Sequence, residues 1–329
     1  MKNPKKKPIK FIAFLLICLI LFVSFVTISL SLLRAVDKND NTIVTFVIPK
    51  GQATQIIAKN LHEEGLIRSP LAFRLLVLQQ GLQNKIQAGS FKLSPNLSTI
   101  ELAHLLTKGT DDVWITIPEG WRREEIAASL VKQDLSNFDE KEFLDLSSGL
   151  EGQLFPETYL VSKASSSQTI VNLLHNTFEN KALALIKEHL PSSNLTVEQV
   201  LTLASLVQRE SAHDTEMPLV AGILFNRLEI NMPLQVDATL QYIKAFSTAE
   251  QNWWSTPTAA DKKLDSAYNT YLNPGLPPAP ICNPGLAAIE AVLNPQSSNA
   301  LYYIHDLSGQ IHTAETLEAH NANVNQYLR

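Results

Sequence analysis

The chain has 329 residues, of which 45% are hydrophobic and 18% are charged, and its formal net charge is −5. This composition is typical of folded domains, and the length suggests about two of them. There is no long basic stretch beyond residue 10, which argues against nucleic acid as a partner. Cys18 lies in an apolar segment and cannot pair with Cys282, and no CxxC spacing indicates a metal site.

The N-terminus combines lysines with an uninterrupted apolar segment. Residues 1–10 carry five lysines, and residues 11–33 carry no charge. At about 1.5 Å per residue, the apolar segment is long enough to cross roughly 30 Å of bilayer hydrocarbon. The lysines predict a cytoplasmic tail at 1–10, a transmembrane helix at 11–33 and an outward-facing remainder. The alternative is a cleaved signal peptide with Ser29-Leu30-Ser31 as a weak site, although the apolar stretch is longer than usual for one.

A strand–turn–helix pattern occurs twice after this segment. FVIPKGQATQIIAKNL (46–61) aligns without gaps on ITIPEGWRREEIAASL (115–130). Each copy has a β-branched run, an Ile-Pro-x-Gly turn and apolar residues at helical spacing. A looser third copy occupies 88–106. We predict a small α+β module over 43–130, acting either as a spacer or as a ligand-binding unit.

A second α+β domain is predicted over 150–329. Its most unusual part is 268–285, which is dense in Pro, Gly and Asn and is therefore expected to be irregular. Long irregular stretches inside compact domains often line functional sites. The regular elements expected around it are helical periodicity from Ile170 to about Leu190, a helix after Thr196, a helix over 286–292, a strand over 300–306 and a helix from Thr316.

The helix after Thr196 ends near a glutamate, Glu210, whose orientation matters. Thr196 and Gln199 form a capping box at its start. At about 100° per residue, Glu210 projects into the apolar arc, between Leu203 and Leu206. The opposite, polar stripe is formed by Glu198, Thr202, Ser205 and Arg209. Loss of hydration at the apolar position would raise the pKa of the Glu210 carboxyl and allow it to donate a proton near neutral pH.

The helical projection alone leaves other roles open for Glu210. It could cap the end of its own helix or pair with Arg227. A two-carboxylate glycosidase would need a partner, for which the candidates are Asp237, Glu157 and Glu151. Other clusters give weaker signals: His213, Asp214 and Glu216 precede a proline in an expected turn, and His305, His312 and His320 are too widely spaced for a ligand set. GxSxG, GxxxxGK and GxGxxG motifs do not occur.

Four segments occur in a recognisable order: LASLVQRE (203–210), LFNRLEINMPLQVDATLQYI (224–243), YNTYLNPGLPPAPICNPG (268–285) and ALYYIHDLSGQIHTAETLEAHNANV (300–324). Together they resemble the endolytic murein transglycosylases, the MltG or YceG-like family. The N-terminal apolar segment, the doubled IPxG pattern and LEGQLFPETY (150–159) match as well. The resemblance covers nearly the whole chain, and the YNTY…GLPP…NPG combination is its most specific part.

The resemblance implies a LysM-like module at 43–130 and a catalytic domain at 150–329. The implied reaction cleaves the MurNAc–GlcNAc β-1,4 bond within nascent glycan strands and leaves a 1,6-anhydro-MurNAc end. One carboxyl can serve as acid and then as base. In the family motif ASIVE-x-E that carboxyl corresponds to Glu210, and the first acidic position of the motif is Gln208 here.

The resemblance also implies a setting for the reaction. No cofactor or metal is expected. The expected partners are peptidoglycan glycan strands, the membrane and the cell-wall synthesis machinery. The location would be the bacterial cytoplasmic membrane, with the catalytic domain facing the periplasm or cell wall.

Further residues match the family's cleft motifs and are expected to bind substrate: Gln235, Asp237, Asn269, Tyr271 and Asn283. Asp237 could instead stabilise positive charge developing at C1. For Asn269 and Asn283, the alternative is hydrogen bonding to loop backbone. Pro277 and Gly285 belong to the same motifs and are expected to shape the loops. Two other functions stay open: a hydrolase using Glu210 and Asp237, and a non-catalytic, membrane-tethered glycan-binding scaffold.

Overall fold

The structure is a computed structural model that describes residues 7–110, 112–190 and 194–328. Helices and short two-stranded sheets confirm the predicted α+β class. Chain contacts divide the molecule into two compact units. The first unit is Met1–Trp114 with Leu160–Ser162, and the second is Ile115–Tyr159 with Lys163–Arg329. The two IPxG segments therefore fall in different units.

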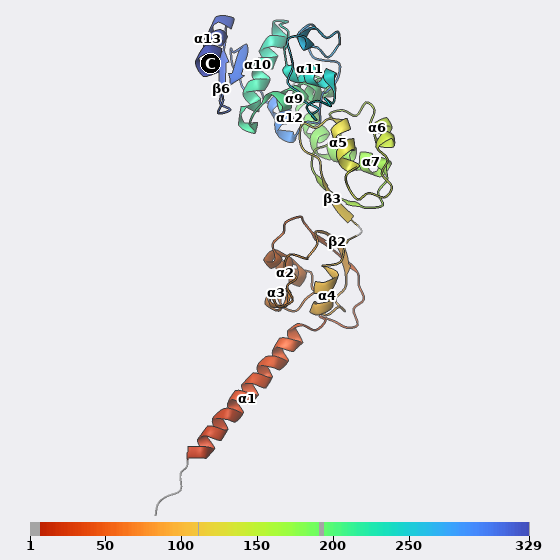
Figure 1. Cartoon of the computed structure of the whole chain (residues 1–329), viewed down its shortest axis with the longest axis vertical. Helices are drawn as coiled ribbons and strands as arrows, with labels where there is room; N and C mark the ends of the chain where they lie inside the picture. The colour runs from red at the N-terminus through yellow and green to blue at the C-terminus, as the bar shows by residue number, and fades with distance from the viewer. Residues whose placement is uncertain (1–6, 111, 191–193, 329) are drawn as a thin grey trace, which may run out of the picture. The chain divides into compact units, whose positions relative to one another are not determined.

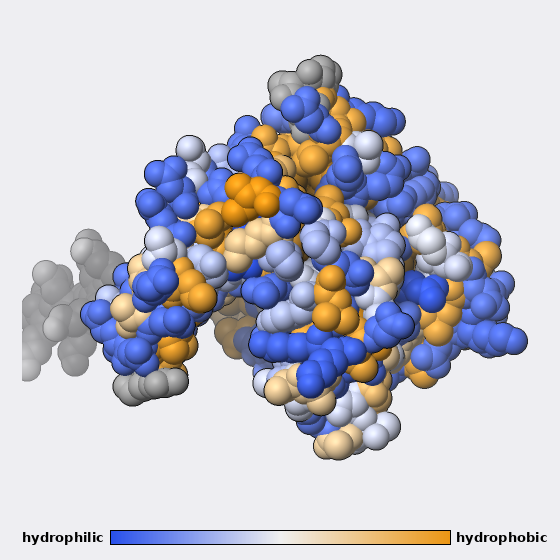
Figure 2. Space-filling view, turned by 90° about the horizontal axis from the view of Figure 1, so that it is seen from above, coloured by the Kyte–Doolittle hydropathy of each residue, from blue (hydrophilic) through white to orange (hydrophobic). Residues whose placement is uncertain are grey.

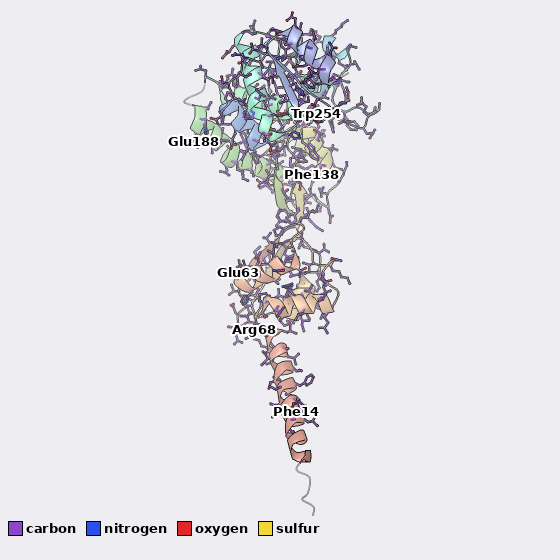
Figure 3. The ribbon with its side chains drawn as sticks, turned by 90° about the vertical axis from the view of Figure 1, so that its left-hand side faces the viewer. Phe14, Glu63, Arg68, Phe138, Glu188 and Trp254 are labelled. Carbon is purple, nitrogen blue, oxygen red and sulfur yellow. The ribbon has the colours of Figure 1, made fainter. Side chains whose placement is uncertain are left out.

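The first unit begins with a long apolar helix, α1 (Lys7–Leu32). Its segment Phe14–Leu32 has a mean hydropathy of 2.8, and none of it is buried by protein. Phe14, labelled in Figure 3, lies on the outside of this helix. By length and composition α1 could cross a membrane. Residues 1–6 of the predicted basic tail lie outside the described residues.

The rest of the first unit packs helices against a two-stranded sheet. The elements are β1 (Val44–Ile48), α2 (Thr54–Glu63), α3 (Pro70–Gln79), β2 (Gly89–Leu93) and α4 (Thr99–Leu105). β1 and β2 are antiparallel and pair Phe46 with Phe91, and both aromatic side chains enter the unit's core. The first IPxG copy forms β1 and α2, and the looser copy forms β2 and α4. The LysM-like assignment stays a prediction.

The second IPxG copy runs from the end of β3 (Asp112–Thr116) into α5 (Arg123–Leu130). Its glycine, Gly120, has a φ of 76°, and Gly51 of the first copy has a φ of 78°. This left-handed backbone explains the glycine in both turns. The elements that follow are α6 (Glu140–Leu146), β4 (Thr158–Ser162), α7 (Ser167–Phe178) and α8 (Ala184–His189), and β4 pairs with β3. A π-helical turn, η1 (Glu179–Leu183), interrupts the predicted helix between α7 and α8.

The core of the second unit is built around α9 (Val197–Glu210). The neighbouring elements are η3 (Asp214–Glu216), α10 (Met217–Glu229), α11 (Asp237–Lys244), η4 (Asp261–Lys263) and α12 (Leu286–Leu293). α9 packs against α8, α10, α11 and α12, and the last three are labelled around it in Figure 1. The predicted capping box of Thr196 and Gln199 is present. Residues 268–285 contain neither helix nor strand, as predicted.

A hairpin and a terminal helix complete this unit. β5 (Tyr302–His305) pairs antiparallel with β6 (Ile311–Ala314), and α13 (Leu317–Tyr327) packs on both strands. The strand predicted over 300–306 corresponds to β5, whereas β6 was not expected.

Outside the core, hydrophilic residues cover most of the face shown in Figure 2, with smaller apolar patches between them.

The middle of the polar stripe of α9 is buried, which the helical projection did not predict. Thr202 is 3% exposed and Ser205 is fully buried. The Ser205 hydroxyl accepts a hydrogen bond from the Ile281 N–H at 3.0 Å and donates to the Thr202 carbonyl at 2.7 Å. Ser205 therefore contacts the irregular 268–285 segment instead of solvent, whereas Glu198 at the start of the stripe is exposed.

Candidate active site

A pocket of about 470 Å³ lies at the C-terminal end of α9. It brings together α9, α10, the start of α11, η4 and the C-terminal hairpin and helix. Its lining consists of Glu210, Arg227, Gln235, Asp237, Lys262, Tyr271, Tyr302, Tyr303, Ile304, Leu317 and His320. The structure thus places Glu210 beside three of the five residues expected to bind substrate.

Glu210 is the last residue of α9, and its side chain is partly exposed to the pocket. The Tyr303 hydroxyl donates a hydrogen bond to Glu210 Oε2 at 2.6 Å. Burial raises the pKa of the Glu210 carboxyl, and the nearby charge of Asp237 raises it further. The Tyr303 hydroxyl, the Ala238 N–H and Arg227 oppose this shift without cancelling it. Glu210 therefore keeps its proton to a higher pH than an exposed glutamate does, as a general acid requires.

Arg227 holds backbone instead of forming the ion pair with Glu210 that the sequence left open. Its Nε donates to the Leu301 carbonyl at 2.6 Å and its Nη1 donates to the Leu234 carbonyl. The guanidinium also lies over the Tyr302 ring, 5.5 Å from the centroid. Arg227 thus ties α10 to the C-terminal hairpin while contributing positive charge to the pocket.

Asp237 and Tyr271 form a second hydrogen-bonded pair in the pocket. The Tyr271 hydroxyl donates to Asp237 Oδ1 at 2.6 Å. Burial and the Asp237 carboxylate raise the pKa of Tyr271, so its hydroxyl stays protonated. Asp237 is the first residue of α11 and is therefore held at a helix N-terminus, a position that favours negative charge.

Gln235 reaches the pocket from an unusual backbone conformation. Its φ is 51°, a left-handed value that is uncommon outside glycine and costs roughly 1–2 kcal/mol. Two hydrogen bonds hold this turn: the Gln235 N–H donates to the Thr270 carbonyl, and the Val236 N–H donates to Thr270 Oγ1, both at 3.0 Å. The turn therefore joins Gln235 to the loop that carries Tyr271.

Asn269 and Asn283 lie outside the pocket lining, and both are fully buried. Asn269 Nδ2 donates to the carbonyls of Lys262 and Leu264. Asn283 Nδ2 donates to the Trp121 carbonyl and to Glu151, and its Oδ1 accepts from the Leu154 N–H. Their amides are thus engaged in holding loops, in line with the alternative that the sequence left open for them.

Asp237 is the one candidate second carboxylate that lines this pocket. Glu157 forms an ion pair with Lys181 at 2.6 Å. Glu151 is buried elsewhere, where it accepts hydrogen bonds from the Arg123 N–H and Asn283. Burial, reinforced by the charge of Glu124, raises the pKa of Glu151 to about 8. Neither Glu157 nor Glu151 lines the Glu210 pocket.

Gln208 joins two loops outside the pocket lining. Its Oε1 accepts a hydrogen bond from the Gly285 N–H at 2.9 Å, and its side chain also bonds Glu119. A Cβ on Gly285 would lie 1.9 Å from Glu119 Oε1, so a larger residue there would displace the Glu119 carboxylate. Gln208 lies outside the pocket lining, and its role here is to connect the IPxG turn with the NPG loop.

Two of the histidines noted in the sequence each pair with one carboxylate. His305 contacts Glu216 at 2.8 Å, and His312 contacts Asp306 at 2.9 Å. Across residues 7–110, 112–190 and 194–328, no group of three His, Cys, Asp or Glu side chains has the arrangement of a metal site. His320 joins the pocket, as do Tyr303, Tyr302 and Lys262, none of which the sequence singled out as substrate-binding.

The chain is similar to curated proteins of known name. An endolytic murein transglycosylase of Streptococcus pneumoniae (strain R6) is 30% identical over 90% of this chain and 60% of its own length. One from Bacillus subtilis (strain 168) is 29% identical over 91% of this chain and 88% of its own length. The chain thus spans about 60% of the length of the pneumococcal relative.

Structural and family comparisons point the same way. The crystal structure of a yceG-like protein from Listeria monocytogenes superposes with a TM-score of 0.54 at 27% identity, covering 85% of this chain and 99% of that one. Residues 46–326 match the model of the YceG-like family. Because this match covers most of the chain, the protein belongs to the YceG-like family.

Proposed function

We propose that this protein is a membrane-anchored endolytic murein transglycosylase that uses Glu210 as its general acid and base. The observation that carries the proposal is the Glu210 carboxyl itself, which lines a pocket, has a raised pKa and is oriented by Tyr303. The relatives that carry this name support the substrate class, which is the glycan strand of peptidoglycan.

In the first step, protonated Glu210 donates its proton to the glycosidic oxygen while the C1–O bond breaks. The Tyr303 hydroxyl donates to Oε2, which leaves Oε1 to carry the acidic proton. GlcNAc departs as an alcohol, and positive charge develops at C1 of MurNAc. The Asp237 carboxylate, in the same pocket, stabilises this charge.

In the second step, the Glu210 carboxylate accepts the proton of the MurNAc C6 hydroxyl. The C6 oxygen then bonds to C1 and closes the 1,6-anhydro ring. No water is consumed, and Glu210 is protonated again for the next cycle. A single carboxyl therefore completes the reaction, which fits the presence of Gln208 where the family has an acid.

The test is Glu210→Gln, which keeps the shape of the side chain and removes its proton chemistry. Cleavage of peptidoglycan glycan strands should fall by roughly 10²–10⁴-fold, the usual contribution of a general acid or base. Glu198→Gln is the matched control, since Glu198 is an exposed glutamate in the first turn of the same helix. A thermal melt of each variant checks that the fold is intact.

Mass spectrometry of the products separates the reaction classes. An anhydro end is lighter than a hydrolysed end by one water. Reducing ends as the main product would instead support the hydrolase that uses Glu210 and Asp237. Undiminished cleavage by Glu210→Gln would rule out the assignment of Glu210, and the absence of any cleavage by the wild-type chain would favour a binding scaffold.

A further inference from the structure

The pocket around Glu210 carries an excess of positive charge. Glu210 is neutral while it is protonated for its role as acid. Burial and Arg227 lower the pKa of His320, so its ring is uncharged near neutral pH. The charged side chains that remain in the lining are Asp237, Arg227 and Lys262. Two cations against one anion leave one positive charge unbalanced.

Lys262 is the more accessible of the two cations. Arg227 is 7% exposed, and its Nε and Nη1 each donate to a backbone carbonyl, whereas Lys262 is exposed at the pocket. Lys262 Nζ lies 4.6 Å from the centroid of the Tyr271 ring. Among the described residues, no carboxylate forms an ion pair with it. A cation–π contact holds the ammonium in place and leaves its N–H groups free to donate.

The backbone under Lys262 is fastened by three neighbouring groups. Asp261 pairs with Lys244 at 3.0 Å and accepts the Thr258 N–H at 2.7 Å. The buried Asn269 side chain donates to the Lys262 carbonyl at 3.2 Å. Lys262 therefore extends from a fixed turn, which lowers the entropy that binding would cost. This also gives Asn269 an indirect part in the site.

We propose that Lys262 binds a carboxylate carried by the glycan substrate, and this inference rests on the proposed function. Sugar rings and their hydroxyls are neutral, so they do not account for an unbalanced cation at the pocket. MurNAc differs from GlcNAc by a lactoyl group, which carries a free carboxylate or, through an amide, a peptide stem with carboxylates of its own. Lys262 would thus select strands by the acidic substituent of MurNAc.

The experiment measures binding in Glu210→Gln protein, in which strands are not cut. The added variants are Lys262→Met and, as matched control, Lys263→Met. Lys263 is the next residue of the same turn, is exposed and lies outside the pocket lining. Four glycan ligands are compared: strands with intact stems, strands with amidated stems, strands stripped of stems by an amidase, and stripped strands whose lactoyl carboxylates are then amidated.

Lys262→Met is expected to weaken binding of carboxylate-bearing strands by roughly fivefold, as for a partly exposed ion pair. The difference between free and amidated strands should nearly vanish in this variant and persist in Lys263→Met. If Lys262→Met weakens the binding of stripped strands alone, Lys262 binds the lactoyl carboxylate. If it weakens the binding of strands with intact stems alone, Lys262 binds a carboxylate of the stem. Equal weakening on amidated strands, or no weakening at all, would overturn the proposal.

The same proteins distinguish failure of this inference from failure of the proposed function. Cleavage by protein with native Glu210 tests the reaction, and binding by Glu210→Gln tests Lys262. If Glu210→Gln abolishes cleavage while Lys262→Met leaves the preference for carboxylates intact, only the inference about Lys262 is wrong. If Glu210→Gln cleaves normally while Lys262→Met loses that preference, only the catalytic assignment is wrong.

Discussion

Opposing influences act on the Glu210 carboxyl. Burial and the charge of Asp237 favour its protonated form, whereas the Tyr303 hydroxyl favours its charged form. Acid and base steps need both forms in turn, so a carboxyl that strongly favoured either one would slow the other step. Tyr303 therefore does more than orient Glu210: it moderates the upward shift of the pKa that burial imposes.

Tyr303→Phe removes this hydrogen bond and little else. Without the donor, the pKa of Glu210 should rise further, because the carboxylate loses a stabilising partner. An acid that must be protonated loses activity as pH rises through its pKa, so the alkaline limb of kcat/KM should move to higher pH. We also expect kcat/KM at its optimum to fall by roughly tenfold.

The pH profile of strand cleavage measures the effect of Tyr303→Phe. Tyr302→Phe is the comparison, because Tyr302 lines the same pocket and no hydrogen bond from it to Glu210 is found in the described part of the chain. The alkaline limb of the Tyr302→Phe pH profile should coincide with that of wild type. A Tyr303→Phe profile displaced to lower pH would contradict the account of Glu210.

Single residues of the site differ in how well the sequence predicts them. The helical projection and the downstream motifs were enough to select Glu210, Asp237, Tyr271 and Gln235, which line one pocket. The same motifs could not separate these from Asn269 and Asn283, because an amide that binds a sugar and an amide that binds backbone look identical in sequence. Tyr303 lies in the predicted strand over 300–306, where successive side chains point to opposite faces. The sequence does not show which of the two faces meets Glu210.

At the level of elements, α9 is buried on more than its apolar side. The predicted polar stripe contacts the irregular 268–285 loop through Ser205. Arg209 of the same stripe lies over the Trp254 ring, 3.8 Å from the centroid, and Trp254 Nε1 donates to Glu125. A helical projection assigns polar residues to solvent by default. Here the loop supplies backbone donors that need buried acceptors, and this pairing arises only in the folded chain.

Ser205→Ala tests this connection between α9 and the loop. The buried Ile281 N–H would lose its acceptor, which should lower the free energy of unfolding by about 1–3 kcal/mol. Chemical denaturation measures the change. Ser148→Ala is the control, because Ser148 is exposed and its loss should cost less than about 0.5 kcal/mol. Equal stabilities of the two variants would show that the Ser205 hydroxyl does not support the loop.

Elements with strong local signals were predicted from the sequence, whereas α3, α6, β4, α10, α11, η1 and β6 were not. The capped helix, the irregular loop and the strand–turn–helix copies carry local signals, namely caps, Pro-Gly turns and periodicity. The π-helical turn η1 and the strand β6 carry none. β6 (Ile311–Ala314) is specified by pairing with β5 in a register that joins Tyr303 to Thr313, and such pairing depends on the partner strand.

At the level of the whole molecule, the apolar helix α1 and the Glu210 pocket belong to different units. The first unit contains α1, and its Arg68 side chain donates hydrogen bonds to the carbonyls of Ala35 and Val36, shortly after the end of α1. The second unit holds the whole lining of the Glu210 pocket. We propose that α1 anchors the chain in the membrane and that the lysines at 1–10 keep its N-terminus in the cytoplasm. Glu210 would then face the cell wall.

Cysteine labelling tests this orientation. The native cysteines give little background, because Cys282 is buried and Cys18 lies in the apolar helix, where Cys18→Ser can remove it. Asn39→Cys, at an exposed position after α1, should react with a membrane-impermeant maleimide in intact spheroplasts. Asn3→Cys, in the basic tail, should react only after lysis. The reverse pattern would contradict the orientation, and a mature chain that lacks the Asn3→Cys label and the mass of residues 1–31 would indicate a cleaved signal peptide in place of an anchor.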